Sequence, residues 1–149
     1  MTVAVDDKDQ GFDLLVRKLS DIKGEVVVGW LDSADPYPDG TSVVTVMAAH
    51  EFGTSELPAR APLRTYFDGG GAKALGDEAA RAMGDVAGGA APSVIGERVG
   101  QVGVEGVRET IKGGLTPALK RPRASGGTSV PLIDTGHALA QLDSRSDID

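Results

Sequence analysis

The sequence contains no cysteine, and this absence removes several kinds of site together. Without a thiol the chain has no disulfide, no zinc site built from thiolates and no cysteine nucleophile. Basic residues are also in deficit, because 15 Lys and Arg stand against 22 Asp and Glu, for a net charge of −7. Proteins whose main task is nucleic-acid binding carry a basic surface that neutralises phosphates, so this class is disfavoured.

Long apolar runs are missing as well. No stretch approaches the roughly 18 consecutive apolar residues of a membrane-spanning helix. Residues 1–7 are acidic, and their apolar part is too short for a signal peptide. We therefore expect a protein with no membrane partner, which stays in the cytoplasm of the cell that makes it unless a particle carries it elsewhere.

Large side chains are scarce. The chain has one Trp, two Tyr and three Phe but 21 glycines, so its 40% of hydrophobic residues are mostly small. A length of 149 residues suits one domain, 1–149. Each large side chain that is fully buried contributes only about 1.5 to 3 kcal/mol. We therefore expect a thin core that gains further burial by association with copies of the same chain.

The first block, 9–66, is expected to contain a helix, a strand and an arm. Apolar residues recur at spacings of three and four over 9–22, which predicts an amphipathic helix. β-branched residues and a tryptophan over 25–31 predict a buried strand. A Pro- and Asp-rich loop follows over 32–40.

The rest of this block has two less regular parts. Residues 43–51 favour a short helix capped by Thr41 or Ser42, although their valines leave a strand open. Pro58 and Pro62 lie four residues apart, a spacing that excludes a regular helix interior and predicts an extended arm over 55–66.

Residues 67–111 form a predicted helical region. Leu75, Ala79, Met83 and Val86 follow the helical spacing and predict a helix over 72–87. Beyond Pro92 two further apolar stripes continue to Ile111, with three glycines between them, Gly100, Gly103 and Gly106. Each interior glycine costs a helix about 0.8 to 1 kcal/mol relative to alanine. Two interpretations stay open: another backbone approaches this helix closely, or the helix is partly frayed.

The last two blocks have little apolar periodicity. Basic residues among glycines and prolines over 112–130 predict a mobile basic loop. The C-terminal segment, 131–149, is expected to run extended to Gly136, form one or two helical turns over 137–142 and end in a polar, acidic tail.

One catalytic pattern is present. Asp134-Thr135-Gly136 after two apolar residues matches the turn that presents a catalytic carboxylate in retroviral-type aspartic proteases, in which two such groups share a proton. In that fold a flap and a second strand–turn unit follow the motif, and residues 137–149 leave no room for them. We favour Asp134 as an N-cap or turn residue and keep an aspartic-type hydrolase as a remote alternative.

Two other patterns lack the required spacing. His50-Glu51 begins like a zinc-binding helix, but position 54, where the second histidine belongs, is Thr. Gly69-Gly70-Gly71 before Lys73 lacks the phosphate-loop spacing and a preceding strand. We therefore expect no catalytic residue, no metal and no cofactor.

Arg60 and Arg64 flank the proline-bracketed segment. Arginine binds phosphates and carboxylates with its planar fork, and the chain is rich in carboxylates. Contact with a neighbouring subunit is therefore favoured over contact with DNA.

Two segments carry a resemblance when taken in order. The first contains Val28-Gly29-Trp30, Tyr37 to Thr41, His50-Glu51-Phe52-Gly53-Thr54 and Leu57 to Arg64, and the second is Pro131-Leu132-Ile133-Asp134-Thr135-Gly136 with Leu139 and Leu142. Together they resemble the Mu-like virion morphogenesis and tail-completion proteins of tailed phages. The sequence departs from that pattern at Ala61-Pro62, where Pro-Phe is usual. The matching segments cover about a third of the chain.

The resemblance implies an α+β fold in which a small sheet packs against the N-terminal helix, with additional helices and extended arms, in a ring-forming subunit. It implies a structural virion protein of the neck, at the head–tail junction, in a homo-oligomeric ring that is commonly sixfold. Other neck and tail proteins would be its partners, and DNA would pass through the ring without sequence-specific binding. A tail terminator or head-closure ring is the alternative. The residues expected to shape this fold and its contacts are Glu51, Phe52, Gly53, Pro58, Arg60, Arg64, Asp134, Thr135 and Gly136.

Overall fold

The computed structural model describes residues 10–118, 132 and 136–149. In this part of the chain the elements follow in the order α1 (Gln10–Asp21), β1 (Val26–Trp30), α2 (Val43–Phe52), α3 (Pro62–Tyr66), η1 (Phe67–Gly71), α4 (Ala72–Ala87), α5 (Ser93–Lys112), α6 (His137–Ala140) and β2 (Leu142–Ser146). η1 contains a kink at Gly70, whose φ of 108° is not helical, between α3 and α4. The fold is α+β, with a two-stranded antiparallel sheet among the described residues.

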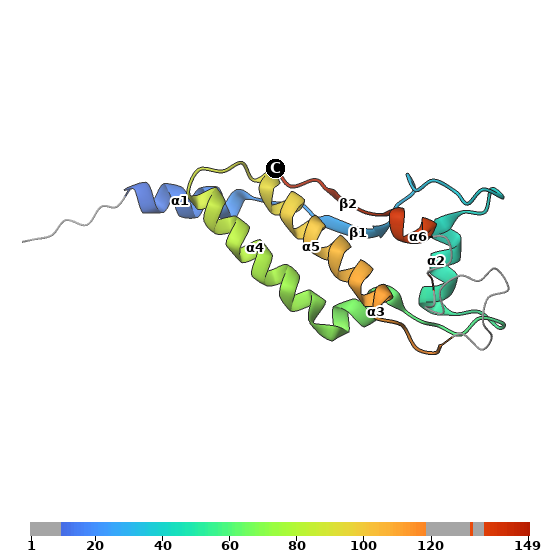
Figure 1. The fold of residues 1–149 in the computed structure, drawn as a ribbon. Coiled ribbons are helices and arrows are strands. Elements are labelled where there is room, and N and C mark those ends of the chain that lie inside the picture. The colour runs from blue at the N-terminus through green and yellow to red at the C-terminus, as the bar shows by residue number, and fades with distance from the viewer. Residues whose placement is uncertain (1–9, 119–131, 133–135) are drawn as a thin grey trace, which may run out of the picture.

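The helix α5 forms the centre of the molecule, with α4 packed on one side and the sheet on the other (Figure 1). β1 and β2 pair antiparallel, with Val26 opposite Ser146 and Trp30 opposite Leu142. At one end of the molecule, α1 lies beside the C-terminal end of α4 (Figure 1). At the other end lie α2, α3 and α6. The molecule is therefore elongated, and its two ends are built from different elements.

Glycines on α5 allow the sheet to approach closely. A Cβ atom on Gly103 would lie 2.7 Å from Val28 Cγ2, and one on Gly100 would lie 2.9 Å from Ser144 Cβ. Gly106 faces the ring of Tyr66 in the same way. Of the two interpretations left open by the sequence, the frayed helix is wrong, because α5 is continuous through all three glycines. What approaches these glycines closely is a set of side chains, Ser144, Val28 and Tyr66.

The sheet does not pack against the N-terminal helix, so this part of the predicted fold is wrong. The helix that covers β1 and β2 is α5, whereas α1 packs against α4. The physical reason is the glycine face of α5, which fits a flat sheet. Only the half-buried side of α1, with Leu15, Leu19 and Ile22, lies against the end of α4.

Two segments that the sequence placed outside regular structure are ordered elements. The predicted arm 55–66 ends in α3, which starts at Pro62 because proline is tolerated in the first turn of a helix. The polar tail contains β2, whose small Ser144 fits against α5 while Asp143 and Arg145 are exposed. Serine and aspartate have low strand propensity, so no sequence pattern indicated this strand.

The predictions for the other elements are confirmed with small shifts of their ends. α1, β1, α4 and the turn α6 lie where the sequence placed them, and residues 43–52 are a helix rather than a strand, capped by Ser42. β1 was expected to be buried, but it is half-buried except at Gly29. The beginning of the predicted basic loop is anchored, because Leu115 is 4% exposed and belongs to the core. Residues 119–130 of that loop lie outside the described part of the chain.

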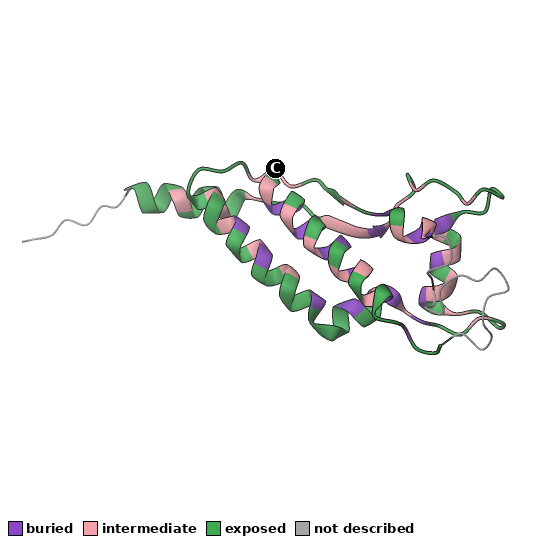
Figure 2. Cartoon of the chain, in the orientation of Figure 1, coloured by how far each residue is buried: buried purple, intermediate pink, exposed green. Residues whose placement is uncertain are grey.

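The core has two parts. The smaller part joins α4 to α5 around Ala82, Ile95 and Val99. The larger part lies where α2, α3, α5 and the C-terminal segment meet, and it consists of Val43, Met47, Tyr66, Val104, Val107, Ile111, Leu115, Leu132, Ala138 and Leu142. In Figure 2 the buried positions (purple) recur along α5, where 95–96, 99–100 and 103–104 are adjacent pairs, whereas α4 has Glu78 and Ala82.

Candidate functional site

The residues singled out from the sequence gather at what we call the α2–α3 corner, made of α2, residues 53–61 and α3. Glu51, in the last turn of α2, is 8% exposed. Its two carboxylate oxygens accept hydrogen bonds from the backbone N–H groups of Leu63 (2.9 Å) and Arg64 (3.1 Å). These groups belong to the first turn of α3, where N–H groups have no partner within the helix. Glu51 therefore caps a second helix that has no side-chain cap of its own.

Residues 53–61 are held by the end of α2. Gly53 has φ 78°, and a Cβ atom there would lie 2.9 Å from the backbone nitrogen of Ala59, so only glycine fits. The backbone N–H groups of Arg60 and Ala61 both donate to the carbonyl of His50, at 2.8 and 3.1 Å. These bonds hold Ala61 in the left-handed region, at φ 44°, from which α3 starts.

Arg60 is buried within its own chain, in contrast to the intersubunit contact expected from sequence. It is 6% exposed, and its Nε donates to the carbonyl oxygen of Pro117 at 2.9 Å. Its Nη1 lies 3.4 Å from Nδ1 of His50. Arg60 therefore ties the corner to the segment after α5. Arg64, by contrast, is exposed on α3 and is open to contact from outside.

Several large apolar side chains lie on the surface. Phe52 is 73% exposed, Phe12 61% and Phe67 39%, so all three phenylalanines of the chain are wholly or partly exposed. Pro58 is exposed as well. Covering such side chains with another surface would add burial that the core of this chain does not supply.

The C-terminal segment meets the first block of the sequence at this end of the molecule. Trp30 Nε1 donates to the carbonyl of Ala138 at 2.7 Å, and the backbone N–H of Asp35 donates to Gln141 Oε1 at 2.7 Å. The rings of Tyr37 and His137 lie 5.0 Å apart. These hydrogen bonds span 108 and 106 residues, and they join the described part of the C-terminal segment to the first block of the sequence.

Arg108 is a positioning residue that sequence reasoning missed. Its guanidinium donates to the carbonyl oxygens of Leu139 (3.2 Å) and Leu142 (3.0 Å), so it fixes the C-terminal segment on α5. Nothing in its local sequence distinguishes Arg108 from the exposed charged residues of the same helix. Gly136 is the N-cap of α6 with φ 78°, whereas Asp134 and Thr135 lie outside the described residues.

A second charged cluster joins α4 to α5. Glu78 accepts hydrogen bonds from Arg81 (2.7 Å) and Arg98 (2.5 Å), and Arg98 also pairs with Asp85. The hydrogen bond from Arg81, followed by that from Arg98, lowers the pKa of Glu78 below its ordinary value. This cluster clamps two helices and leaves its carboxylates paired.

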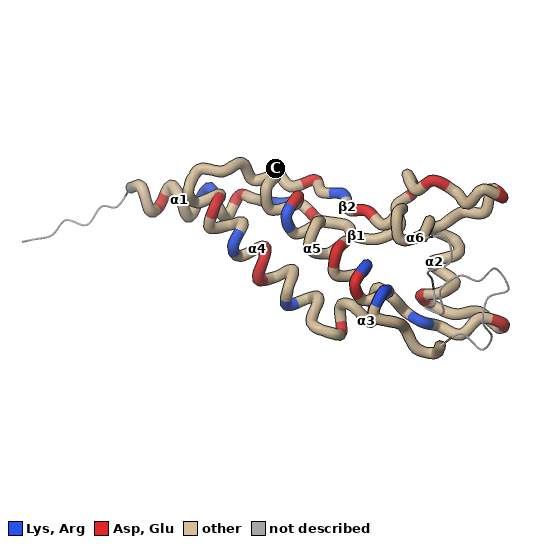
Figure 3. The backbone as a smooth tube through the Cα atoms, viewed as in Figure 1, with Lys and Arg blue, Asp and Glu red and all other residues tan. Residues whose placement is uncertain are grey.

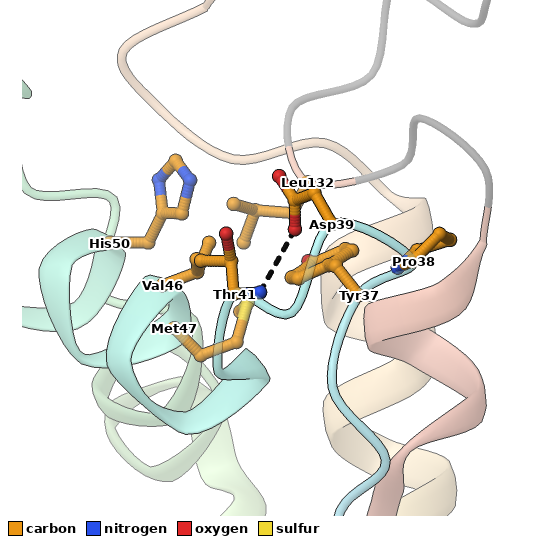
Figure 4. A pocket seen from close by; sticks show the side chains of 8 residues that line it. All are labelled: Tyr37, Pro38, Asp39, Thr41, Val46, Met47, His50 and Leu132. Atoms are coloured by element: carbon orange, nitrogen blue, oxygen red, sulfur yellow. Dashed lines mark hydrogen bonds between the residues drawn. The ribbon is translucent and has the colours of Figure 1, made fainter.

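A pocket of about 460 Å³ opens beside the corner. Figure 4 shows its lining, which comes from the loop before α2, from α2 itself and from one C-terminal residue: Tyr37, Pro38, Asp39, Thr41, Val46, Met47, His50 and Leu132. Asp39 accepts a hydrogen bond from the backbone N–H of Thr41 at 2.9 Å, which lowers the pKa of Asp39. The polar groups drawn there shape the loop, and the lining is otherwise mainly apolar.

The buried polar groups of the corner bond to the backbone and to each other. Both oxygens of Glu51 are taken by backbone N–H groups, and Arg60 by a carbonyl and a histidine. Within residues 10–118, 132 and 136–149, no three His, Asp or Glu side chains gather as metal ligands. No helix in the same residues is long and apolar enough to cross a membrane.

Comparisons with protein-family models, with curated proteins and with solved structures found no match to this chain.

Proposed function

We propose that this chain is a structural subunit of a phage particle, placed in the neck, where it completes the tail at the head–tail junction. It acts by assembling into a ring with other copies and has no catalytic residues, metal or cofactor. Capsid-side and tail-side neck proteins lie above and below the ring. In this role the protein is found in the virion, and in the host cytoplasm during assembly.

The observation that carries the proposal is the surface position of the large apolar side chains. Phe52 is 73% exposed and Leu14 is 59% exposed, whereas the buried core of the described residues contains one aromatic side chain, Tyr66. Burial against other subunits is the simplest gain available to such a chain. An obligate assembly subunit needs such surfaces, whereas an enzyme needs a group of polar side chains held ready for a substrate.

Two further observations support an assembly role. The buried polar residues Glu51, Arg60 and Glu78 are used in hydrogen bonds that hold elements together. The net charge of −7 suits a ring through which DNA slides, because an acidic wall does not retain phosphates. The resemblance of the two sequence segments adds the specific place in the particle.

The experiment that tests the proposal is deletion of the gene from its parent phage or prophage, followed by negative-stain electron microscopy of the lysate. We expect filled heads and finished tails that remain separate. Tails of abnormal length would instead favour a tail terminator, and leaking heads a head-closure ring. Normal infectious particles would contradict every structural role.

The remote alternative, a hydrolase that uses Asp134, needs its own test. Asp134→Asn removes the carboxylate that an aspartic-type enzyme requires. We expect the variant to complement the deletion, with at most a small loss of stability. Loss of complementation by a variant with wild-type folding and stability would bring the hydrolase back.

A further inference from the structure

We propose that two copies of this chain associate through the outer edge of β2, which pairs antiparallel with β2 of the second copy. The two-fold axis passes between the two Ser144 residues, and the four strands form one continuous sheet. A two-fold contact is complete with two copies, so it differs from the repeating contact that builds a ring. The inference goes beyond the neck role and does not rest on it, since it follows from the backbone and charges of one strand.

Hydrogen bonds across the sheet identify the outer edge of β2. In an antiparallel pair, successive residues direct their N–H and C=O groups alternately toward the partner strand and away from it. The N–H of Asp147 donates to the carbonyl of Glu25 at 3.2 Å. The backbone groups of Asp143 and Arg145, at steps of two residues from Asp147, therefore also face β1. The backbone groups of three residues face away from β1, at the edge of the sheet: Leu142, Ser144 and Ser146.

Two bonds within the chain agree with this direction. Asp143 Oδ1 accepts from the N–H of Ser144 at 2.8 Å, and Arg108 donates to the carbonyl of Leu142 at 3.0 Å. Among the described residues, no hydrogen bond is found to the carbonyl of Ser144 or to the N–H and carbonyl of Ser146. Such an edge can accept another strand, since main-chain groups supply the affinity.

The side chains of β2 determine which strand fits. Ser144 lies against Gly100 of α5. Since successive side chains of a strand point to opposite faces, Asp143 and Arg145 lie on the face away from α5, where both are exposed. Arg145 has no ion pair among the described residues. Figure 3 shows acidic and basic positions along β2, so one open face carries both signs of charge two positions apart.

Antiparallel pairing about a two-fold axis brings these unlike charges together. With Ser144 opposite Ser144 of the second copy, Asp143 of each copy lies opposite Arg145 of the other. These positions form non-hydrogen-bonded pairs, in which opposite side chains are closest. A shift of the register by two residues would instead place two copies of Arg145, or two copies of Asp143, opposite each other. β1 carries no charged residue, so its outer edge offers no comparable match.

The backbone groups are satisfied in the same arrangement. Ser144 exchanges two hydrogen bonds with Ser144 of the second copy, and Leu142 exchanges two with Ser146 of the second copy. The carboxylate of Asp143 then leaves the N–H of Ser144 and binds the guanidinium across the interface. The carbonyl of Leu142 has two lone pairs, so it keeps its bond from Arg108. Register, charge and backbone thus specify the same partner, a second copy of β2.

The test exchanges the two charges in the full-length protein. Asp143→Arg makes the open face of β2 doubly basic, and Arg145→Asp makes it doubly acidic. Either variant alone places like charges opposite each other, and we expect its dimer to dissociate about tenfold more readily than that of the wild type. A mixture of the two variants restores both ion pairs between unlike chains. The double variant Asp143→Arg/Arg145→Asp restores them between like chains, and sedimentation velocity at low salt measures every case.

Matched controls make the same changes of charge on α1. Asp13→Arg and Arg17→Asp alter exposed positions outside the proposed contact and should leave the association unchanged. Recovery of the dimer in the mixture and in the double variant supports the pairing. The proposal is overturned by a wild type that stays monomeric at every concentration, by equal weakening in the α1 controls, or by a mixture that associates no better than each variant alone.

Hydrogen exchange locates the contact at the level of single amides. As the dimer forms with rising concentration, the amides of Ser144 and Ser146 should gain protection. The amides of Val26 and Val28 face away from β2 at the other edge of the sheet, so they should exchange at the same rate throughout. Protection gained at Val28 rather than at Ser144 would assign the contact to β1 and refute the proposed pairing.

Discussion

The contact between α5 and the sheet and the α2–α3 corner are both short of large side chains, yet they are held together differently. In the first, glycines of α5 bring the helix so close to Val28 and Ser144 that small side chains fill the space between them. In the second, buried polar side chains form hydrogen bonds with backbone groups that have no other partner within their helix. Glu51 does this for the N–H groups at the start of α3. Close approach gains dispersion contacts, whereas the corner depends on a few directional hydrogen bonds.

The comparison teaches where each region is vulnerable. A surface of small residues has no room for an added atom, so it is sensitive to enlargement. A corner held by capping groups tolerates changes of size at its exposed positions but not the loss of a carboxylate. The predictions below test this difference, from the largest expected effect to the smallest.

Tyr66 joins the two regions, because it ends α3 and its ring lies against Gly71 and Gly106. Tyr66→Ala leaves a cavity in the larger part of the core and is expected to cost about 3 to 5 kcal/mol, as for other buried aromatic residues. Phe52→Ala, at a 73% exposed position, should change stability by no more than about 0.5 kcal/mol. Urea unfolding followed by circular dichroism measures both values. Similar losses for the two variants would contradict the burial pattern.

Glu51→Ala tests the corner. It leaves two N–H groups at the start of α3 without their carboxylate partner, and we expect a loss of about 2 to 3 kcal/mol. Glu56→Ala, at an exposed position in the same corner, is the matched control and should be close to neutral. Hydrogen exchange of the amides of Leu63 and Arg64 provides a local readout. Unchanged protection of these amides in Glu51→Ala would refute the capping role.

Gly103→Ala tests close approach. In a helix interior this change normally gains about 0.8 to 1 kcal/mol, but here the new Cβ atom meets the stiff side chain of Val28. We expect a net loss of about 1 to 2 kcal/mol through overpacking. Gly76→Ala on α4, where a Cβ atom meets nothing within 4 Å, should show the ordinary gain. The opposite signs are the prediction, and thermal unfolding of both variants checks them.

The smallest effect concerns acid sensitivity. Hydrogen bonds from Arg81 and Arg98 lower the pKa of Glu78 below the ordinary value of 4.5, so the folded state favours the charged form. The resulting stability is complete above pH 4.5 and is lost as the pH falls through the folded pKa. Glu78→Gln should therefore show a smaller drop in the urea midpoint between pH 7 and acid pH than the wild type. An identical drop in both proteins would remove Glu78 from the acid response.

Much of the local structure followed from sequence patterns. The spacing of Phe12, Leu15, Val16 and Leu19 predicted α1, and the stripe through Leu75 and Val86 predicted α4. Thr41 or Ser42 was expected to cap α2, and Ser42 does so. Glu51 and Gly53 lie at the end of α2, and a helix end followed by a glycine is a local feature of the sequence. These predictions succeeded because capping and amphipathicity depend on residues a few positions apart.

The partners of these elements did not follow from the sequence. Ser144 and Ser146 form a strand only because β1 provides an edge and α5 a glycine surface, and Arg60 turned inward because Pro117 and His50 supply acceptors there. Such contacts join residues far apart in the chain, and their energy exists only after the chain has folded. The sequence by itself therefore determined α1, α2, α4 and α5 but not α3 or β2. The tertiary structure decided which surface of each helix is covered, because those contacts join residues far apart in the chain.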